Sequence, residues 1–125
     1  MLNQKIADLL EEIAQLLEFE GPKNPGEIFR IKAYHRVAVT IRDLPQAIET
    51  IAQEGKLREI TGVGEAIAGK IEEYIKTGKI KVYEELHKNV PPGLIELMNI
   101  PGMGPKTVRR LYEELGVKDQ QSLQA

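Results

Sequence analysis

The chain has 125 residues, enough for one compact domain or two very small ones. Hydrophobic residues make up 42% and charged residues 29%, which is typical of a soluble protein with a core. The lack of cysteine excludes disulfides and thiolate metal sites. Apolar runs are too short to span a membrane, and no signal-peptide core follows the first residues, so we expect a cytoplasmic protein with no membrane partner.

The formal net charge of −2 argues against a polycation that coats nucleic acid. The charges are unevenly distributed along the chain. Residues 1–29 hold six acidic side chains and two lysines, a net charge of −4, which leaves +2 for the remainder. This asymmetry predicts one acidic face and one mildly basic face.

Hydrophobic periodicity predicts helices throughout the chain. Apolar residues recur at helical spacing from residue 2 to residue 17, and the glycine- and proline-rich segment 21–26 is predicted to be non-helical. A second helix is expected over residues 28–41. A third is expected to begin near Pro45, with Asp43 as its cap, and to stop at Gly55.

Four more helices are expected after a turn at Lys56, over residues 65–76, 81–87, 91–99 and 105–116. Gly78 and Gly116 are the predicted stops of two of them. No stretch alternates with the two-residue period of a strand, so we expect essentially no sheet. The predicted fold class is therefore all-α, with two small helical subdomains at residues 1–80 and 81–125.

An internal repeat with an offset of 40 residues is the most informative feature of the sequence. Ile60-Thr61-Gly62-Val63-Gly64 aligns with Ile100-Pro101-Gly102-Met103-Gly104, and a predicted helix follows each copy. So tight a turn between helices requires the positive φ angles that glycine adopts, and a side chain at either glycine would obstruct an approaching phosphate. The free N–H groups and positive end of the second helix can then bind an anion without contacting a base.

The side chain of the residue between the glycines, Val63 or Met103, is predicted to pack into the core. A Gly-x-Gly turn can be no more than a helix connection, but two in-register copies, each preceded by isoleucine, argue against that reading. The sequence fits the dinucleotide-binding fingerprint poorly. That fingerprint needs a preceding strand and a third glycine, and Gly69 does not lie at the spacing required of the third glycine.

The chain resembles the N-terminal part of family X DNA polymerases, the polymerase beta group, and especially its bacterial and archaeal members. The resemblance covers nearly the whole chain and implies an 8 kDa domain at residues 1–80 followed by a helical DNA-binding domain at 81–125, truncated before the palm. Each domain would hold one helix-hairpin-helix motif. The segments that carry the resemblance are residues 29–34, 60–64, 67–71, 77–80 and 100–107.

This resemblance implies non-sequence-specific DNA binding in DNA repair, on gapped or nicked duplexes with a 5′-phosphate, by a nucleoid-associated monomer. It also implies an optional Na⁺ or K⁺ ion held by backbone carbonyls, those of Arg58, Ile60 and Val63 in one hairpin and of Met98, Ile100 and Met103 in the other. The expected DNA-binding residues are Gly62, Val63, Gly64, Gly102, Met103, Gly104, Lys106, Thr107, Arg30 and Tyr34, with Tyr34 the one aromatic expected at a DNA surface.

Polymerisation is not expected of this chain, although its parent protein would be a DNA polymerase. The reaction needs clustered carboxylates for two metal ions, whereas Asp8, Asp43 and Asp119 are far apart in the sequence.

Two alternatives stay open. One is a 5′-deoxyribose-phosphate lyase that forms a Schiff base at Lys70, the position that matches the lysine of the animal enzymes. A free lysine is almost wholly protonated near neutral pH and needs desolvation or nearby cations to become a nucleophile. Here Ala66, Val82 and Phe29 stand at positions where the family has supporting lysines or histidine, and Arg30 replaces another lysine. The other alternative is a protein-interaction domain on the same scaffold.

Overall fold

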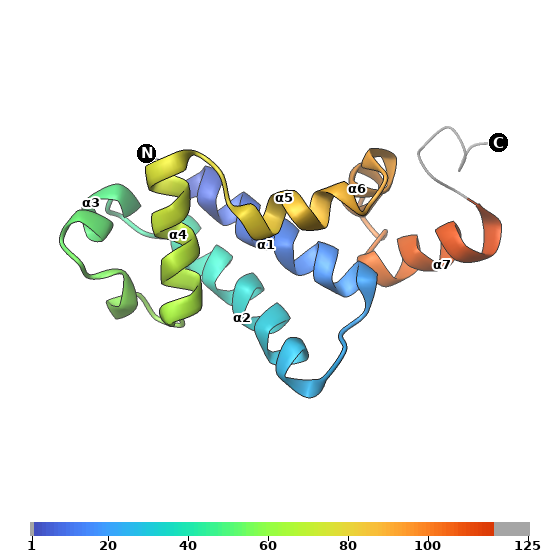
Figure 1. The fold of residues 1–125 in the computed structure, drawn as a ribbon, viewed down its shortest axis with the longest axis horizontal. Helices are drawn as coiled ribbons and strands as arrows, with labels where there is room; N and C mark the ends of the chain where they lie inside the picture. Colours follow the sequence, from blue (N-terminus) through green and yellow to red (C-terminus); the bar gives the residue numbers. More distant parts are fainter. Residues whose placement is uncertain (1, 117–125) are drawn as a thin grey trace.

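Seven α-helices and one 3₁₀ turn make up the regular structure of residues 2–116, the part of the chain that the computed structural model describes (Figure 1). Met1 and residues 117–125, including Asp119, lie outside it. No strand occurs in this described part, so the all-α prediction is confirmed, and none of its helices is long and apolar enough to cross a membrane. The elements are α1 Asn3–Glu20, α2 Pro25–Arg42, α3 Ile48–Gln53, η1 Leu57–Glu59, α4 Glu65–Thr77, α5 Lys81–Lys88, α6 Pro92–Met98 and α7 Pro105–Leu115.

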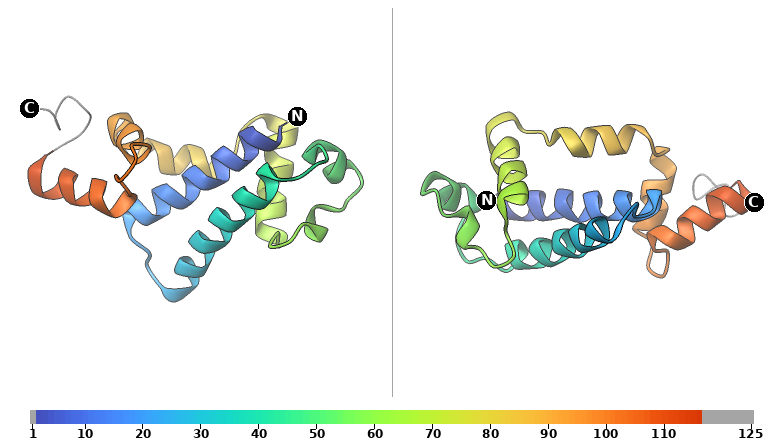
Figure 2. Two further views of the ribbon diagram at one scale, coloured as in Figure 1. Left: turned by 180° about the vertical axis from the view of Figure 1, so that it is seen from behind. Right: turned by 60° about the horizontal axis from the view of Figure 1, so that its bottom comes forward.

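Helices α1 and α2 form an antiparallel pair at the centre of the molecule (Figures 1 and 2). Helix α2 begins at Pro25, inside the segment predicted to be non-helical, so that prediction is wrong for its last two residues. The side chain of Asn24 accepts a hydrogen bond from the N–H of Glu27 at 2.9 Å, and Pro25 occupies the first helical position, where its missing N–H is not needed.

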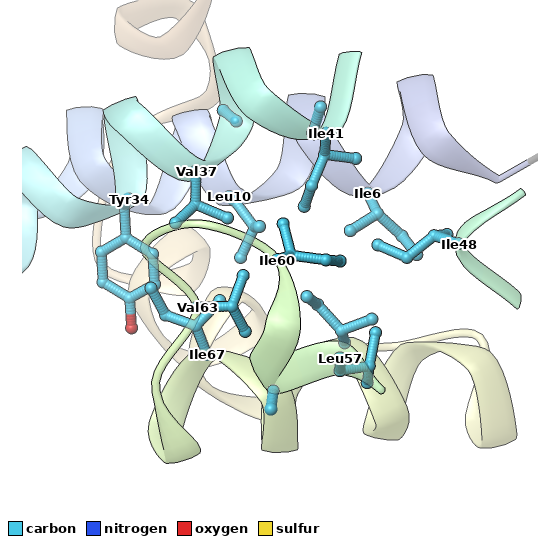
Figure 3. Close-up of a cluster of buried hydrophobic side chains, with 14 of the residues drawn as sticks. Ile6, Leu10, Tyr34, Val37, Ile41, Ile48, Leu57, Ile60, Val63 and Ile67 are labelled. Carbon is cyan, nitrogen blue, oxygen red and sulfur yellow. The ribbon is translucent and has the colours of Figure 1, made fainter. Parts of the chain in front are cut away.

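Two hydrophobic cores lie along α1. The first contains Ile6, Leu10 and Ile13 of α1, together with side chains of α2, α3 and the segment around η1 and α4 (Figure 3). The second contains Leu16 and Phe19 of α1, packed with side chains of α6 and α7. One helix therefore contributes to both cores. The domain division at residue 80 stays a prediction, because Tyr83 and Leu86 pack against both.

Ion pairs join the acidic side of α1 to α2. The Arg42 guanidinium donates to Asp8 Oδ1 at 2.8 Å and to Glu11 Oε2 at 2.6 Å, and these carboxylates raise the pKa of Arg42. His35 Nε2 lies 3.0 Å from Glu18 Oε1. Part of the negative charge concentrated in residues 1–29 is thus countered by Arg42 on α2.

The start of α3 differs from the prediction. Helix α2 continues to Arg42 with Asp43 as its C-terminal cap, and α3 begins only at Ile48, so the expected start at Pro45 with Asp43 as cap is wrong. The cap comes instead from Asn3 at the start of α1. Its Oδ1 accepts from the N–H of Ile48 at 2.9 Å, and its Nδ2 donates to the carbonyl of Gln46 at 2.8 Å. Asn3 is buried, so its bond with Ile48 is shielded from water, whereas its bond with Gln46 is only partly shielded.

We predict that Asn3→Ala lowers the free energy of unfolding by about 1–3 kcal/mol, because it leaves the buried N–H of Ile48 and the part-buried carbonyl of Gln46 without partners. Urea denaturation followed by circular dichroism measures the change. Gln4→Ala, which removes an exposed amide from the next position, is the control and should shift stability by less than about 0.5 kcal/mol. Equal stabilities of the two variants would contradict the role given to Asn3.

Candidate nucleic-acid interface

The two Gly-x-Gly turns have the same backbone hydrogen bonds, with the 40-residue offset kept bond by bond. Ile60 N donates to Leu57 O at 3.1 Å, as Ile100 N does to Leu97 O. The next bonds run from Val63 N to Ile60 O at 3.0 Å and from Met103 N to Ile100 O at 2.9 Å. The third pair runs from Ala68 N to Gly64 O at 2.9 Å and from Val108 N to Gly104 O at 3.0 Å. The sequence repeat is therefore also a structural repeat.

The two glycines of each turn have different roles. Gly62 and Gly102 have φ angles of 87° and 85°, the left-handed region that glycine adopts most readily. Gly64 and Gly104 have φ angles of −93° and −76°, so the positive φ expected of each turn occurs at its first glycine and not at its second. A Cβ at Gly64 or Gly104 would meet nothing within 4 Å. The fold itself therefore gives no steric reason for glycine there, and the space in front of each turn is open.

Gly64 and Gly104 are the N-caps of α4 and α7, and no side chain caps either helix. The first helical N–H groups that pair with a backbone carbonyl are those of Ala68 and Val108. The preceding N–H groups of each helix lack an intrahelical acceptor and point toward the open space, together with the positive end of the helix dipole. Because Pro105 has no N–H, Lys106 and Thr107 supply these donors in α7. Such a cluster of donors suits an anion.

The apolar residue of each turn is directed inward, as predicted. Val63 belongs to the first core, where Figure 3 shows it near Ile67, and Met103 is half-buried against the second core. Gly62 also lies close to α2, since a Cβ on it would meet Val37 at 3.4 Å. The apolar side of each turn therefore packs against a core, while its glycines stay exposed.

The hairpins differ in charge. In the first hairpin, the exposed Glu65 is the first residue of α4, and its Oε2 lies 3.1 Å from Nη2 of Arg58. In the second, the equivalent position is Pro105 and the next residue is exposed Lys106. The second hairpin therefore offers a more favourable electrostatic environment to an anion than the first.

The structure brings Arg30 and Tyr34 to the first hairpin. Both line a shallow depression of about 280 Å³ whose other walls include Gly62 and Gly64. Tyr34, however, is only 4% exposed and belongs to the first core, so its expected place at a DNA surface is wrong for its ring (Figure 3). Lys70 is half-buried, with its Nζ 5.8 Å from the centre of the Tyr34 ring, and it does not line the depression.

Two exposed residues on α2 lie near the hairpins but were not among the expected DNA-binding residues. Phe29 is 72% exposed and is the exposed aromatic of this region in place of Tyr34. Lys32 lies with Lys106 around a second depression of about 240 Å³, although 74 residues separate them in the sequence. Phe29 does not share the helical spacing of the buried residues of α2. This spacing could have predicted from the sequence that its side chain is exposed. No local pattern could have paired Lys32 with Lys106.

The Na⁺ or K⁺ ion expected at the two turns stays a prediction. The carbonyls of Ile60 and Ile100 each accept one backbone hydrogen bond, which leaves each a second lone pair. The other expected ligands are the carbonyls of Arg58 and Val63 in the first turn and of Met98 and Met103 in the second, and oxygen ligands are the type that Na⁺ and K⁺ prefer.

Both turns lie on one side of the molecule. In the right-hand view of Figure 2 they lie along the lower edge, with α2 between them. The helices that follow the turns run in different directions, since α4 stands roughly upright and α7 runs roughly across the view in Figure 1.

Comparison with known proteins places this geometry in a family. Residues 1–80 match the family model of the helix-hairpin-helix domain, and residues 93–125 match that of the SAM-like helix-hairpin-helix tandem. The chain is 37% identical over 123 residues to the DNA polymerase/3'-5' exonuclease PolX of Bacillus subtilis (strain 168). The matched region covers 98% of the chain and 20% of that protein. It is 27% identical over 114 residues to DNA polymerase lambda of Arabidopsis thaliana, covering 90% of the chain and 20% of that protein.

The chain spans about a fifth of the length of these two relatives. The resemblance to family X DNA polymerases that the motifs indicated is confirmed. Since a family model covers residues 1–80 and the hairpin geometry recurs at both copies, the chain belongs to the helix-hairpin-helix domain family.

Proposed function

We propose that this chain binds DNA without sequence specificity, with one backbone phosphate held by each helix-hairpin-helix turn. The observation that carries the proposal is the pair of identical turns in which an exposed glycine leaves the N–H groups of a helix N-terminus open to solvent. A phosphate can approach these groups closely because no side chain precedes them. Contacts of this kind position the protein on DNA and read no base.

The relatives support this proposal, since both are named as DNA polymerases. We propose that the chain is the DNA-binding front region of a family X repair polymerase and that it does not itself polymerise. No group of three or more His, Asp or Glu side chains suited to a metal ion occurs in residues 2–116. Association with the nucleoid would follow from such binding. A monovalent ion at each turn would add positive charge beside the phosphate.

The combined change Gly64→Val and Gly104→Val tests the turns directly. Valine fits the backbone angles at both positions and its Cβ meets no neighbour within 4 Å, so the helices should persist with a modest loss of stability from poorer capping. Its side chain occupies the space of the phosphate. We predict a loss of affinity for duplex DNA of roughly tenfold or more for each hairpin, the value of a lost charge-assisted hydrogen bond. Fluorescence anisotropy at low salt measures it.

Gly69→Val is the matched control, because Gly69 is exposed, has open space around it and lies within α4. It should leave the affinity unchanged. Equal binding by the double variant and the unsubstituted chain would reject the proposal. The salt dependence separates DNA binding from a protein-interaction role: the slope of log K against log salt should be about −0.9 for each phosphate neutralised.

Glu65→Gln should raise the affinity for DNA about two- to fivefold, because it removes a negative charge next to the phosphate and releases Arg58 from its ion pair. The same anisotropy titration measures this gain. Glu72→Gln removes an equal charge from an exposed position farther along α4 and should have a smaller effect. If both substitutions raise affinity equally, only the overall charge matters and the phosphate does not lie at the first hairpin.

The depression beside the first hairpin supports a finer proposal, a preference for gapped or nicked duplexes with a 5′-phosphate. Arg30 borders it, and a terminal phosphate carries more charge than a diester. We propose that Lys70 adds charge nearby and does no covalent chemistry. No cation stands at Ala66 or Val82 to favour a neutral amine, and Lys70 lies against the ring of Tyr34.

We therefore predict that Arg30→Gln reduces the preference for a 5′-phosphorylated gap in competition with the same gap lacking the phosphate. Arg36→Gln, which changes an exposed α2 arginine outside the depression, is the control.

Borohydride on a pre-incised abasic duplex should trap little protein, spread over several lysines. Fast trapping confined to Lys70 would contradict this account and establish the lyase instead.

A further inference from the structure

Helix α7 carries the second hairpin's anion-binding end, yet its apolar attachment to the rest of the molecule is small. Among its residues with described side chains, only Val108 is fully buried. Leu111 and Tyr112 are partly buried against the same core. So small a contact area fixes the direction of a helix poorly, because apolar packing is not directional. A directional contact is needed to hold α7 in one orientation.

Arg109 supplies directional contacts between α7 and the C-terminal end of α1. Its Nη1 donates to the carbonyl oxygen of Phe19 at 2.9 Å, across 90 residues of sequence. Its guanidinium carbon lies 5.1 Å from the centre of the Phe19 ring, a cation–π distance. Within α7, its Nε donates to Glu113 Oε1 at 2.6 Å, which orients the guanidinium group. One side chain thus joins α7 to both the backbone and the ring of a residue in α1.

The carbonyl that Arg109 contacts is at the end of a helix. The N–H of Gly21 already donates to the carbonyls of Leu17 and Glu18, whereas the Phe19 carbonyl is among the last of α1 and has no helical donor. A cation at this end also interacts favourably with the negative end of the helix dipole. Phe19 is buried, with its ring 6.2 Å from that of Tyr112, so the contact is partly shielded from water.

We propose that Arg109 is a positioning residue that fixes the second hairpin against α1, so that the two hairpins bind one DNA molecule as a unit of set spacing. The proposal rests on the DNA binding proposed above. Rigid linkage makes binding by the second hairpin intramolecular, and its contribution is greatest when the spacing matches the ligand. A loosely held α7 would lose part of that contribution even with its own turn intact.

The first test measures the spacing in the absence of DNA. Because the chain has no cysteine, Glu72→Cys in α4 and Thr107→Cys in α7 give two unique spin-label sites. The distance distribution between the labels should be narrow in the otherwise unsubstituted chain and broad with Arg109→Gln. Arg110→Gln removes the same charge from the neighbouring, mostly exposed arginine and should stay narrow. Arg109→Lys, which keeps the charge without the planar guanidinium, should give an intermediate width.

The second test uses unlabelled chains and a duplex of roughly thirty base pairs, three helical turns. The loss of affinity caused by Gly104→Val should be about tenfold smaller in the Arg109→Gln background than in the Arg110→Gln background. The reason is that the second hairpin already contributes less to binding when Arg109 is replaced. Circular dichroism of each variant checks that helicity is retained.

An unchanged narrow distribution in Arg109→Gln would overturn the proposal. So would a broad distribution combined with the full effect of Gly104→Val, because the second hairpin would then bind without a fixed spacing. If the unsubstituted chain binds no DNA at all, the proposed function fails. The distance distribution would still decide for or against the anchor.

Discussion

Helix α1 contributes buried side chains to both hydrophobic cores of the molecule. Its first half completes the core that supports the first hairpin, and its last turns complete the core that supports the second. An α-helix is stiff and rises about 1.5 Å per residue, so the side chains that serve the two cores keep a nearly constant separation. The two hairpins are therefore parts of one scaffold, although the family models match them as separate segments. The second hairpin, in particular, has a core that includes Leu16 and Phe19 from the other end of the chain.

The turns combine a requirement of the fold with an opening for a ligand. The first glycine of each turn satisfies a backbone angle, and the second satisfies no steric demand of the protein. Glycine is also a weaker N-cap than a residue with a capping side chain, since it leaves the end of the helix unsatisfied. Its occurrence at the same position of both hairpins fits a phosphate as the missing partner of those N–H groups. The charge difference at Glu65 and Lys106 means that the two hairpins need not contribute equally.

Most of the fold could be predicted from the sequence because it is encoded locally. Helical periodicity and helix-ending glycines such as Gly78 and Gly116 placed most helices close to their true positions. The repeat predicted the hairpins and the inward direction of Val63. The errors occurred where distant residues decide the outcome. The start of α3 depends on Asn3, whose side chain replaces the local cap expected at Asp43. Tyr34 was placed at the surface because its neighbour is an arginine, but its position on α2 faces the first core. The contact of Arg109 with Phe19 spans 90 residues, and no spacing rule reports it.

Phosphate binding by the two hairpins can be measured by titrating the isotope-labelled chain with short duplexes and following the backbone amide signals. If the hairpins bind phosphate, the largest shifts should occur at the free amides of the two helix N-termini, residues 64–67 and residues 104, 106 and 107. The shifts should be the same for duplexes of different sequence and should disappear as the salt concentration rises. Shifts confined to other surfaces, with these amides unmoved, would contradict phosphate binding by the hairpins.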